Sequence, residues 1–195
     1  MFLMKCGSRK LPKDYMISNM GPANICPAKV RGLCLVCNQY GKCYAEDDEI
    51  QYPAPRPYRV KQMTYWLRND AETIWQDIDK QLSRKRKLPS HFRFNESGDF
   101  WKQACIEKLD YIAGKLKDKY GIITYGYTAR ADLDFSGVKN FLVKGSGHKG
   151  GNNGETRVFP KKGDIPEGWF TCPGSCKACD MCTKKNGQDV AFIKH

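Results

Sequence analysis

Residues 91–128 read HFRFNESGDFWKQACIEKLDYIAGKLKDKYGIITYGYT, and this stretch decides the fold class. The alternation at 91–95 predicts a strand, and apolar residues at helical spacing predict an amphipathic helix over residues 99–120. Gly121 is expected to end that helix, and residues 122–127 are expected to form the next strand. Strands joined in this way are parallel neighbours with a right-handed crossover, so the stretch predicts an α/β fold.

The segments before this unit are expected to supply a strand and two helices. A short strand is expected at residues 16–20, before a Gly-Pro pair. Residues 60–84 keep roughly helical apolar spacing, with a break at Asn69 and with Asp70 as the cap of the second helix. The proline-rich stretch 52–57 is expected to be a loop or a linker, because proline disrupts helices and central strands.

After the unit, further strands are expected at residues 140–144 and 157–159, on either side of the glycine-rich loop 145–154. The chain of 195 residues is long enough for one domain with a real core. We therefore expect a single α/β domain over residues 1–195, built on an incomplete parallel (β/α) barrel-like sheet. Two cysteine-rich segments, 26–43 and 172–182, are expected to pack on it as metal-binding loops.

Eight of the ten cysteines fall into two groups of four. The second group has the spacing C-x3-C-x2-C-x2-C, which is short enough to wrap an iron–sulfur cluster. The first group is looser, with intervals of seven, two and five residues. We expect each group to bind one 4Fe–4S cluster through its four thiolates. The ligands would be Cys26, Cys34, Cys37 and Cys43 in the first group, and Cys172, Cys176, Cys179 and Cys182 in the second.

Zinc is the alternative to iron. A zinc ribbon joins two C-x2-C pairs from distant parts of a chain, and Cys34 and Cys37 with Cys179 and Cys182 satisfy that rule. The other four cysteines would then hold a second zinc ion. A disulfide scaffold is disfavoured, because no signal peptide is visible and a reducing cytosol keeps thiols free. The two remaining cysteines, Cys6 and Cys105, are expected to be buried core thiols.

The chain is basic, with 33 Lys and Arg against 21 Asp and Glu and a formal net charge of +12. This surplus suggests a polyanionic partner, with nucleic acid first and an acidic protein second, although it is equally compatible with a merely soluble surface. No apolar run approaches the roughly 20 residues that cross a bilayer, so no membrane partner is expected. The candidate phosphate contacts are Arg84, Lys85, Arg86, Lys87, Lys144 and Lys149.

Polar residues also follow the ends of two predicted strands. Because sites in α/β folds gather at the carboxyl ends of strands, we expect these side chains to face one cleft beside the cysteine groups. The structural alternative is that Ser97 or Asp99 caps the following helix and that Arg130 pairs with an acid. Residues of the candidate cleft are Glu96, Ser97, Asp99, Tyr127, Thr128 and Arg130.

Several of these motifs together resemble a phage and plasmid family called gene product eighty-eight. They are Cys26-Pro27, Cys43-Tyr44-Ala45, residues 93–100, residues 127–130 and the closing four-cysteine run. That family is in turn similar, more distantly, to radical-SAM-like partial barrels, in which three cysteines spaced C-x3-C-x2-C hold a 4Fe–4S cluster that binds S-adenosylmethionine. The first group of this chain is spaced differently.

The leading hypothesis is a cytoplasmic iron–sulfur protein with two 4Fe–4S clusters that transfers electrons to a partner protein, encoded by a phage or plasmid as the resemblance implies. The first alternative is a radical-SAM-like enzyme that modifies nucleic acid or protein and uses S-adenosylmethionine. It requires that only three cysteines of the first group bind, which leaves one iron open. The second alternative is a nucleic-acid-binding protein stapled by iron–sulfur clusters or by two zinc ions.

Overall fold

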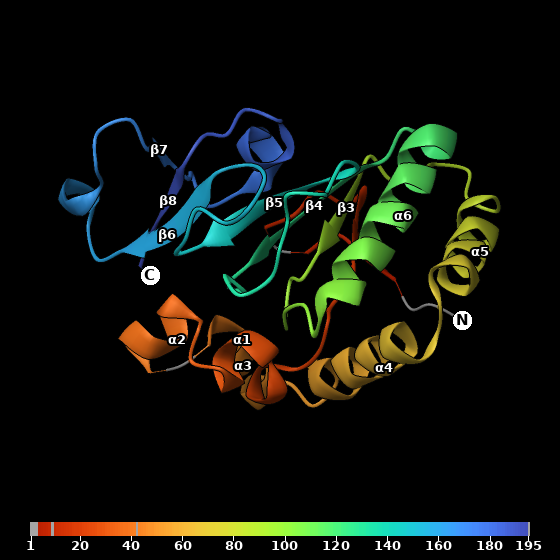
Figure 1. The fold of residues 1–195 in the computed structure, drawn as a ribbon, viewed down its shortest axis with the longest axis horizontal. Coiled ribbons are helices and arrows are strands. Elements are labelled where there is room, and N and C mark those ends of the chain that lie inside the picture. The colour runs from red at the N-terminus through yellow and green to blue at the C-terminus, as the bar shows by residue number, and fades with distance from the viewer. Residues whose placement is uncertain (1–3, 9, 42, 195) are drawn as a thin grey trace.

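The computed structural model describes residues 4–8, 10–41 and 43–194, and one sheet runs through this part of the chain (Figure 1). Its strands follow the order β1-β2-β3-β4-β5-β6-β8-β7. The β1–β2 pair is antiparallel, and every other pair is parallel. The strands are β1 (Lys5–Cys6), β2 (Tyr15–Ile17), β3 (His91–Phe94), β4 (Ile123–Thr128), β5 (Phe141–Ser146), β6 (Glu155–Phe159), β7 (Phe170–Thr171) and β8 (Val190–Ile193).

This arrangement confirms a mixed α/β fold with a mostly parallel sheet, including the expected parallel pairing of β3 with β4. The pairing defines a sheet with β1 and β7 at its edges in the described residues. It does not by itself define a barrel, so the incomplete barrel stays a prediction. The helices are α1 (Pro27–Val30), α2 (Leu35–Tyr40), α3 (Tyr44–Gln51), α4 (Pro55–Arg68), α5 (Ala71–Leu82) and α6 (Gln103–Tyr120).

The two expected helices before β3 are present as α4 and α5, separated at Asn69 and Asp70. Asp70 caps α5, because its carboxylate accepts a hydrogen bond from the Thr73 backbone N–H at 2.7 Å. The expectation that residues 52–57 contain no helix is wrong, since α4 begins at Pro55. The first turn of a helix tolerates proline, because its N–H groups have no partner within the helix.

Helix α6 ends as expected, at Gly121 with a φ of 67°. It begins four residues later than expected, at Gln103, and its N-cap is Lys102. The prediction that Asp99 caps this helix is therefore wrong. The carboxylate of Asp99 accepts hydrogen bonds from Phe100 and from the end of β4 instead, which keeps residues 99–102 out of the helix.

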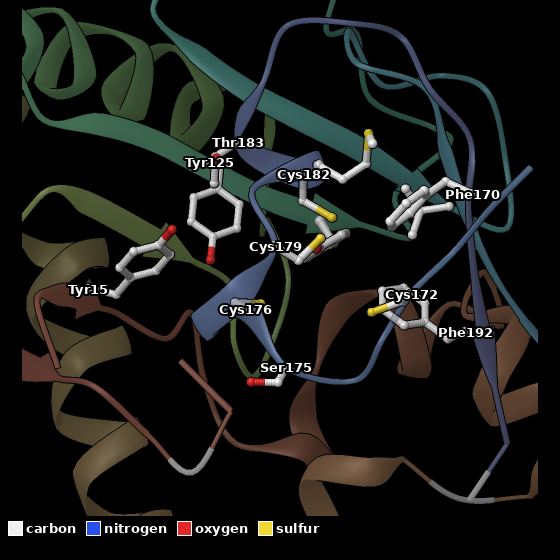
Figure 2. Close-up of a pocket in the computed structure, with 13 residues that line it drawn as sticks. Tyr15, Tyr125, Phe170, Cys172, Ser175, Cys176, Cys179, Cys182, Thr183 and Phe192 are labelled. Atoms are coloured by element: carbon white, nitrogen blue, oxygen red, sulfur yellow. The ribbon is translucent and has the colours of Figure 1, made fainter. Parts of the chain in front are cut away.

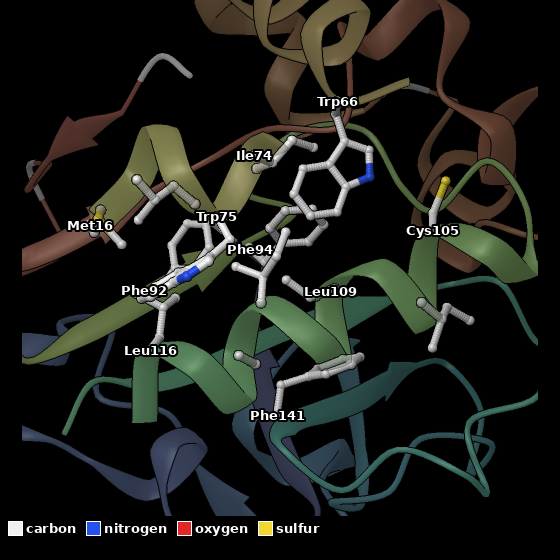
Figure 3. Close-up of a cluster of buried hydrophobic side chains, with 14 of the residues drawn as sticks. Met16, Trp66, Ile74, Trp75, Phe92, Phe94, Cys105, Leu109, Leu116 and Phe141 are labelled. Atoms are coloured by element: carbon white, nitrogen blue, oxygen red, sulfur yellow. The ribbon is translucent and has the colours of Figure 1, made fainter. Parts of the chain in front are cut away.

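The larger core lies between the sheet and helices α4, α5 and α6 (Figure 3). Alternation along the strands sends Phe92 and Phe94 of β3 into this core, together with Phe141 and Val143 of β5. Cys105 is buried there at 1% exposure, as predicted for a core thiol. Cys6 lies on the edge strand β1 and is exposed, so its predicted burial is wrong.

The opposite face of the sheet is covered by a smaller cluster and not by a helix. Tyr15, Ile17 and Tyr125 form its buried part, and Cys176 and Cys182 pack against them. The C-terminal segment therefore returns to cover the face that the long helices leave free. Helices α1, α2 and α3 lie together at another side of the sheet, next to the start of α4 (Figure 1). No helix in the described residues is long and apolar enough to cross a membrane.

Candidate metal centre

The second cysteine group lines a single hollow on this helix-free face (Figure 2). Its four side chains come from one loop between β7 and β8, shaped by two short turns of 3-10 helix, η3 (Cys176–Ala178) and η4 (Met181–Thr183). Tyr125 and Tyr127 of β4 form the floor of the hollow. The structure therefore gathers all four predicted thiols of this group at one place.

Backbone hydrogen bonds hold this loop on the sheet. The Cys172 N–H donates to the Ala191 carbonyl of β8 at 2.8 Å, and the Cys176 N–H donates to the Lys10 carbonyl at 3.0 Å. The enclosed volume is small, about 30 Å³.

Two hydroxyl groups of β4 approach the second group. Tyr127 donates a hydrogen bond to the Cys182 sulfur, which favours the thiolate of Cys182. Tyr125 is only 1% exposed, and its hydroxyl has no partner in the described part of the chain. A buried hydroxyl without a partner is costly, and this one belongs to a residue that lines the hollow. Such a donor suits an additional acceptor in the hollow, such as a sulfide or a thiolate.

Positive charge also approaches the second group from the sheet. The Arg93 guanidinium lies 3.9 Å from the centre of the Tyr127 ring and interacts with Cys176 and Cys182. Lys144 is a second cation near Cys182. Burial raises the pKa of Cys172, Cys176 and Cys182, so these groups are protonated unless a cation or a metal compensates.

The first cysteine group is built in a different way, on the ends of three short helices. Cys26 precedes α1, Cys34 precedes α2 and Cys43 precedes α3, each as the N-cap residue. Backbone N–H groups of the following turns lie near these three sulfurs and act to lower the pKa of each thiol. Such donors stabilise thiolates, which are the form of cysteine that binds metal.

Three thiols of this group are linked by hydrogen bonds through Cys37. Cys37 hydrogen-bonds with both Cys34 and Cys43. The hydrogen bond from Cys37 lowers the pKa of Cys34 to about 6 and also lowers the pKa of Cys43, while the pKa of Cys37 itself is raised. Cys26 is not part of this hydrogen-bonded set, and burial, followed by the nearby charge of Asp99, raises its pKa to about 12.

Asp99 lies beside this first group and is the best-connected residue of the predicted cleft. Its carboxylate accepts hydrogen bonds from the Thr128 hydroxyl at 2.7 Å, from the Ala129 N–H at 2.7 Å and from the Phe100 N–H at 2.8 Å. Burial nevertheless raises the pKa of Asp99 to about 6. Asp99 interacts electrostatically with Cys26 and with Cys34, so the cleft and the first group adjoin.

Arg130 also lies near Asp99, but its guanidinium pairs with Asp132, as the structural alternative predicted. Its Nε and Nη2 donate to the two carboxylate oxygens of Asp132 at 2.6 and 2.8 Å. Its Nη1 donates to the Phe100 carbonyl. The guanidinium therefore ties the strand end to the segment that precedes α6, and it is only 2% exposed.

The other three residues of the predicted cleft do not face Asp99. Ser97 donates to the Gly21 carbonyl at 3.0 Å and has a structural role. The Glu96 carbonyl accepts a hydrogen bond from the Tyr44 hydroxyl. Tyr127 points to the opposite face of the sheet, towards Cys182, because neighbouring residues of a strand alternate between faces. The single predicted cleft is therefore divided between the two cysteine groups.

The candidate phosphate contacts fall into exposed residues and one buried residue. Residues 84–87 follow α5 and are exposed. Lys149 is exposed as well, with Asp189 at 3.6 Å from its ammonium group. Lys144 is buried at 1% exposure and donates to the Asn153 and Gln188 carbonyls, so its prediction as a phosphate contact is wrong. Its side chain faces the second cysteine group because it alternates with Val143 on β5.

The glycine-rich loop 145–154 is held in place by hydrogen bonds at several points. The His148 ring nitrogen Nε2 lies 3.0 Å from the Thr128 carbonyl oxygen. The Asn153 N–H donates to Val143 at 3.0 Å, and the Gly147 N–H donates to Thr156 at 2.8 Å. The loop also approaches α2, since a Cβ atom on Gly147 would meet Leu35 at 2.9 Å.

The described residues contain no set of three or more His, Cys, Asp or Glu side chains already positioned around a single metal ion. A tetrahedral zinc site with Zn–S bonds of about 2.3 Å requires such convergence. A 4Fe–4S cluster does not require it, because each thiolate binds a different iron atom. The donor sets fit a cluster in their chemistry: each has four cysteines, backbone or side-chain donors, and for the second group an unpartnered hydroxyl.

The sequence of the first group and of the sheet identifies the family. A family model described as gene product 88 matches residues 3–149. The chain belongs to the gene product 88 family. The gene product 88 match covers the first cysteine group, Asp99 and the strands up to β5, and it ends before the second cysteine group. No curated protein and no solved structure shows significant similarity to the chain.

Sequence reasoning missed two residues of the second site, Arg93 and Tyr125. Both lie on predicted strands: Arg93 alternates with the apolar core residues Phe92 and Phe94, and Tyr125 follows the buried Thr124. Arg93 of β3 lies on the same face as Tyr125 and Tyr127 of β4. This pattern indicates that a segment with polar groups covers that face of the sheet. That signal was available in the alternation, although it does not say which segment provides the cover.

Proposed function

We propose that the protein is an iron–sulfur protein that binds one 4Fe–4S cluster at each cysteine group and transfers electrons to and from a partner protein. One observation carries the proposal: the four thiols of Cys172, Cys176, Cys179 and Cys182 line one hollow with the unpartnered Tyr125 hydroxyl. Thiolates on a short flexible loop are the ligands that such clusters use, and when bound a cluster supplies one-electron chemistry.

The surroundings of the second group support a redox role. Arg93 and Lys144 bring positive charge towards the thiolates, and Tyr127 donates a hydrogen bond to Cys182. Net charge and hydrogen bonds to sulfur are two of the factors that set the reduction potential of a cluster. These residues would therefore raise the potential of the second centre relative to that of a cluster without such neighbours.

A reductive titration of protein purified without oxygen tests this function. We expect the absorption of the oxidised protein to bleach on addition of dithionite and to return on air-free reoxidation, with an electron paramagnetic resonance signal in the reduced state. Two separable reduction steps are expected, because the two groups have different charged neighbours. A protein that carries clusters but neither bleaches nor gives a signal would contradict the electron-transfer role.

A second candidate function is an iron–sulfur enzyme of the radical-SAM-like kind. The observation in its favour is that Cys37 hydrogen-bonds with Cys34 and Cys43, while Cys26 has no such bond within the described residues and lies beside Asp99. With only three cysteine ligands, one iron of the first cluster would have no protein ligand and would lie near Asp99. In this case the variant Cys26→Ser keeps its iron and Cys37→Ser loses it; if the first group is saturated, both variants lose iron.

A further inference from the structure

A pocket of about 330 Å³ lies at the amino-terminal ends of β2 and β3. The turn between β1 and β2 forms one wall with Lys13 and Asp14. The segment between α5 and β3 forms the other wall with Lys85 and Lys87, and Pro89 follows. This end of the sheet is opposite to the carboxyl ends of the strands, where Asp99 and Thr128 lie.

Hydrogen bonds hold the two walls together. The Ser90 hydroxyl donates to the Asp14 carboxylate at 2.6 Å, and the Ser90 N–H donates to the Asp14 carbonyl at 3.0 Å. The Tyr15 N–H donates to Pro12 at 3.1 Å, which fixes the turn that carries Lys13. The walls are therefore fixed relative to each other, whereas the lysine side chains on them are free to reach a ligand.

The lining of the pocket carries a positive net charge, with three lysines against one aspartate. Lys13, Lys85 and Lys87 are exposed, and no ion pair of 4 Å or less involves them there. Asp14 is the one acidic residue of the lining; its carboxylate accepts a hydrogen bond from Ser90 and interacts electrostatically with Lys87, so it offsets one of the three positive charges. Residues 84–87 form an uninterrupted basic run that extends the positive charge beyond the pocket.

We infer that this pocket and the adjoining run bind the phosphodiester backbone of a nucleic acid without reading its sequence. Lysine ammonium groups bind phosphate as compact point charges, and three of them share one lining here. The pocket contains no aromatic residue for base stacking, so it is suited to the backbone and not to the bases. The inference does not depend on the cysteine groups, which lie outside the pocket lining.

The test measures the binding of a labelled single-stranded oligonucleotide of about 20 nucleotides by fluorescence anisotropy over a range of salt concentrations. The pocket variant is Lys13→Gln with Lys87→Gln. The control variant is Lys115→Gln with Lys117→Gln, which removes the same charge from the exposed side of α6. All four lysines are exposed, and circular dichroism checks that both variants remain folded.

The pocket variant should bind more weakly, and the slope of log K against log salt should become shallower by about 1.4, the loss of two single-strand phosphate contacts. The control variant should keep the wild-type slope. Equal losses in both variants would overturn the inference in favour of unspecific attraction by net charge. Absence of binding, competition as effective by a mononucleotide, or competition as effective by polyglutamate would overturn it as well.

Discussion

The two cysteine groups differ in the elements that position their thiols and in the groups that contact their sulfurs. In the first, three cysteines precede three short helices as their N-cap residues, and the backbone N–H groups of the following turns favour their thiolates. In the second, the cysteines lie on a loop against the sheet, and side chains of β3, β4 and β5 supply the polar contacts. The first group lies within the part of the chain that matches the family, and the second lies beyond it.

This difference shows that spacing in sequence does not measure how closely the fold gathers cysteines. The second group is the more compact in sequence, and its four thiols line one hollow on the sheet. The first group is the looser in sequence, yet Cys37 contacts both Cys34 and Cys43. The short helices bring these cysteines together because Cys26, Cys34 and Cys43 are each the N-cap of a helix, and the start of that helix fixes where the side chain points.

The largest expected effect is the loss of one centre on removal of a ligand. We expect Cys182→Ser to lower the iron content from about eight to about four atoms per chain, because one of two 4Fe–4S clusters is lost. Iron analysis and the absorption spectrum measure this. The control is Cys6→Ser, which changes an exposed thiol on β1 and should leave the iron content unchanged.

The next effect concerns Asp99, which supports the first group from the sheet. Asp99→Asn replaces a carboxylate that accepts three short hydrogen bonds with a group that has a single acceptor oxygen. We expect a loss of about 2–4 kcal/mol in the free energy of unfolding, since buried N–H and O–H donors lose their partners. Asp134→Asn, at an exposed carboxylate, should change stability little in the same urea titration.

The raised pKa of Asp99 predicts a pH dependence of the free energy of unfolding that Asp99→Asn should lack. Burial raises the pKa of Asp99 from its ordinary value of 3.8 to about 6, so the folded state binds more protons between these values. The stability contributed by protonated Asp99 is complete below pH of about 4 and is lost as the pH rises through about 6. Urea titrations at several pH values should show this decline in the parent protein but not in Asp99→Asn.

A smaller effect is expected at Arg93, which distinguishes the second group. Arg93→Gln removes a positive charge near Cys176 and Cys182. The reduction potential of the second centre should become more negative by on the order of 60 mV, equivalent to a tenfold change in a one-electron equilibrium. Arg68→Gln, on the exposed end of α4, is the matched control. Equal shifts of the reduction potential in both variants would show that Arg93 has no specific effect on the second centre.

The smallest expected effect separates the two tyrosines of β4. Tyr127→Phe removes a hydrogen bond to Cys182 and should cost about 0.5–1.5 kcal/mol of stability in the metal-free protein. Tyr125→Phe removes a buried hydroxyl that has no partner in the described residues, so stability should be unchanged or slightly higher. Thermal unfolding of both variants measures this, and a larger loss in Tyr125→Phe would contradict the assigned contacts.

Much of the sheet could be predicted from the sequence. Strands β3, β4, β5 and β6 lie within a few residues of their predicted positions, because alternation and glycine boundaries mark them clearly. Helices α4, α5 and α6 have enough turns for their apolar spacing to be recognised. Helices α1, α2 and α3 are too short for this, and they were missed although they carry the first cysteine group.

The candidate site was harder to predict than the fold. Asp99, Thr128 and Arg130 meet as expected at the carboxyl ends of the strands, because parallel strands bring their ends to one edge. Tyr127 and Lys144 were assigned to the wrong surroundings, because sequence position was used without the alternation of side chains between the two faces. The cover of the second face depends on contacts between residues more than forty positions apart, such as Lys144 with Gln188.

The most direct test of the account is the content of iron, acid-labile sulfide and zinc in protein purified without oxygen, measured together with its absorption spectrum. Two 4Fe–4S clusters predict about eight irons and about eight sulfides per chain, with little zinc and broad absorption. A colourless protein with about two zinc ions and no sulfide would contradict the account.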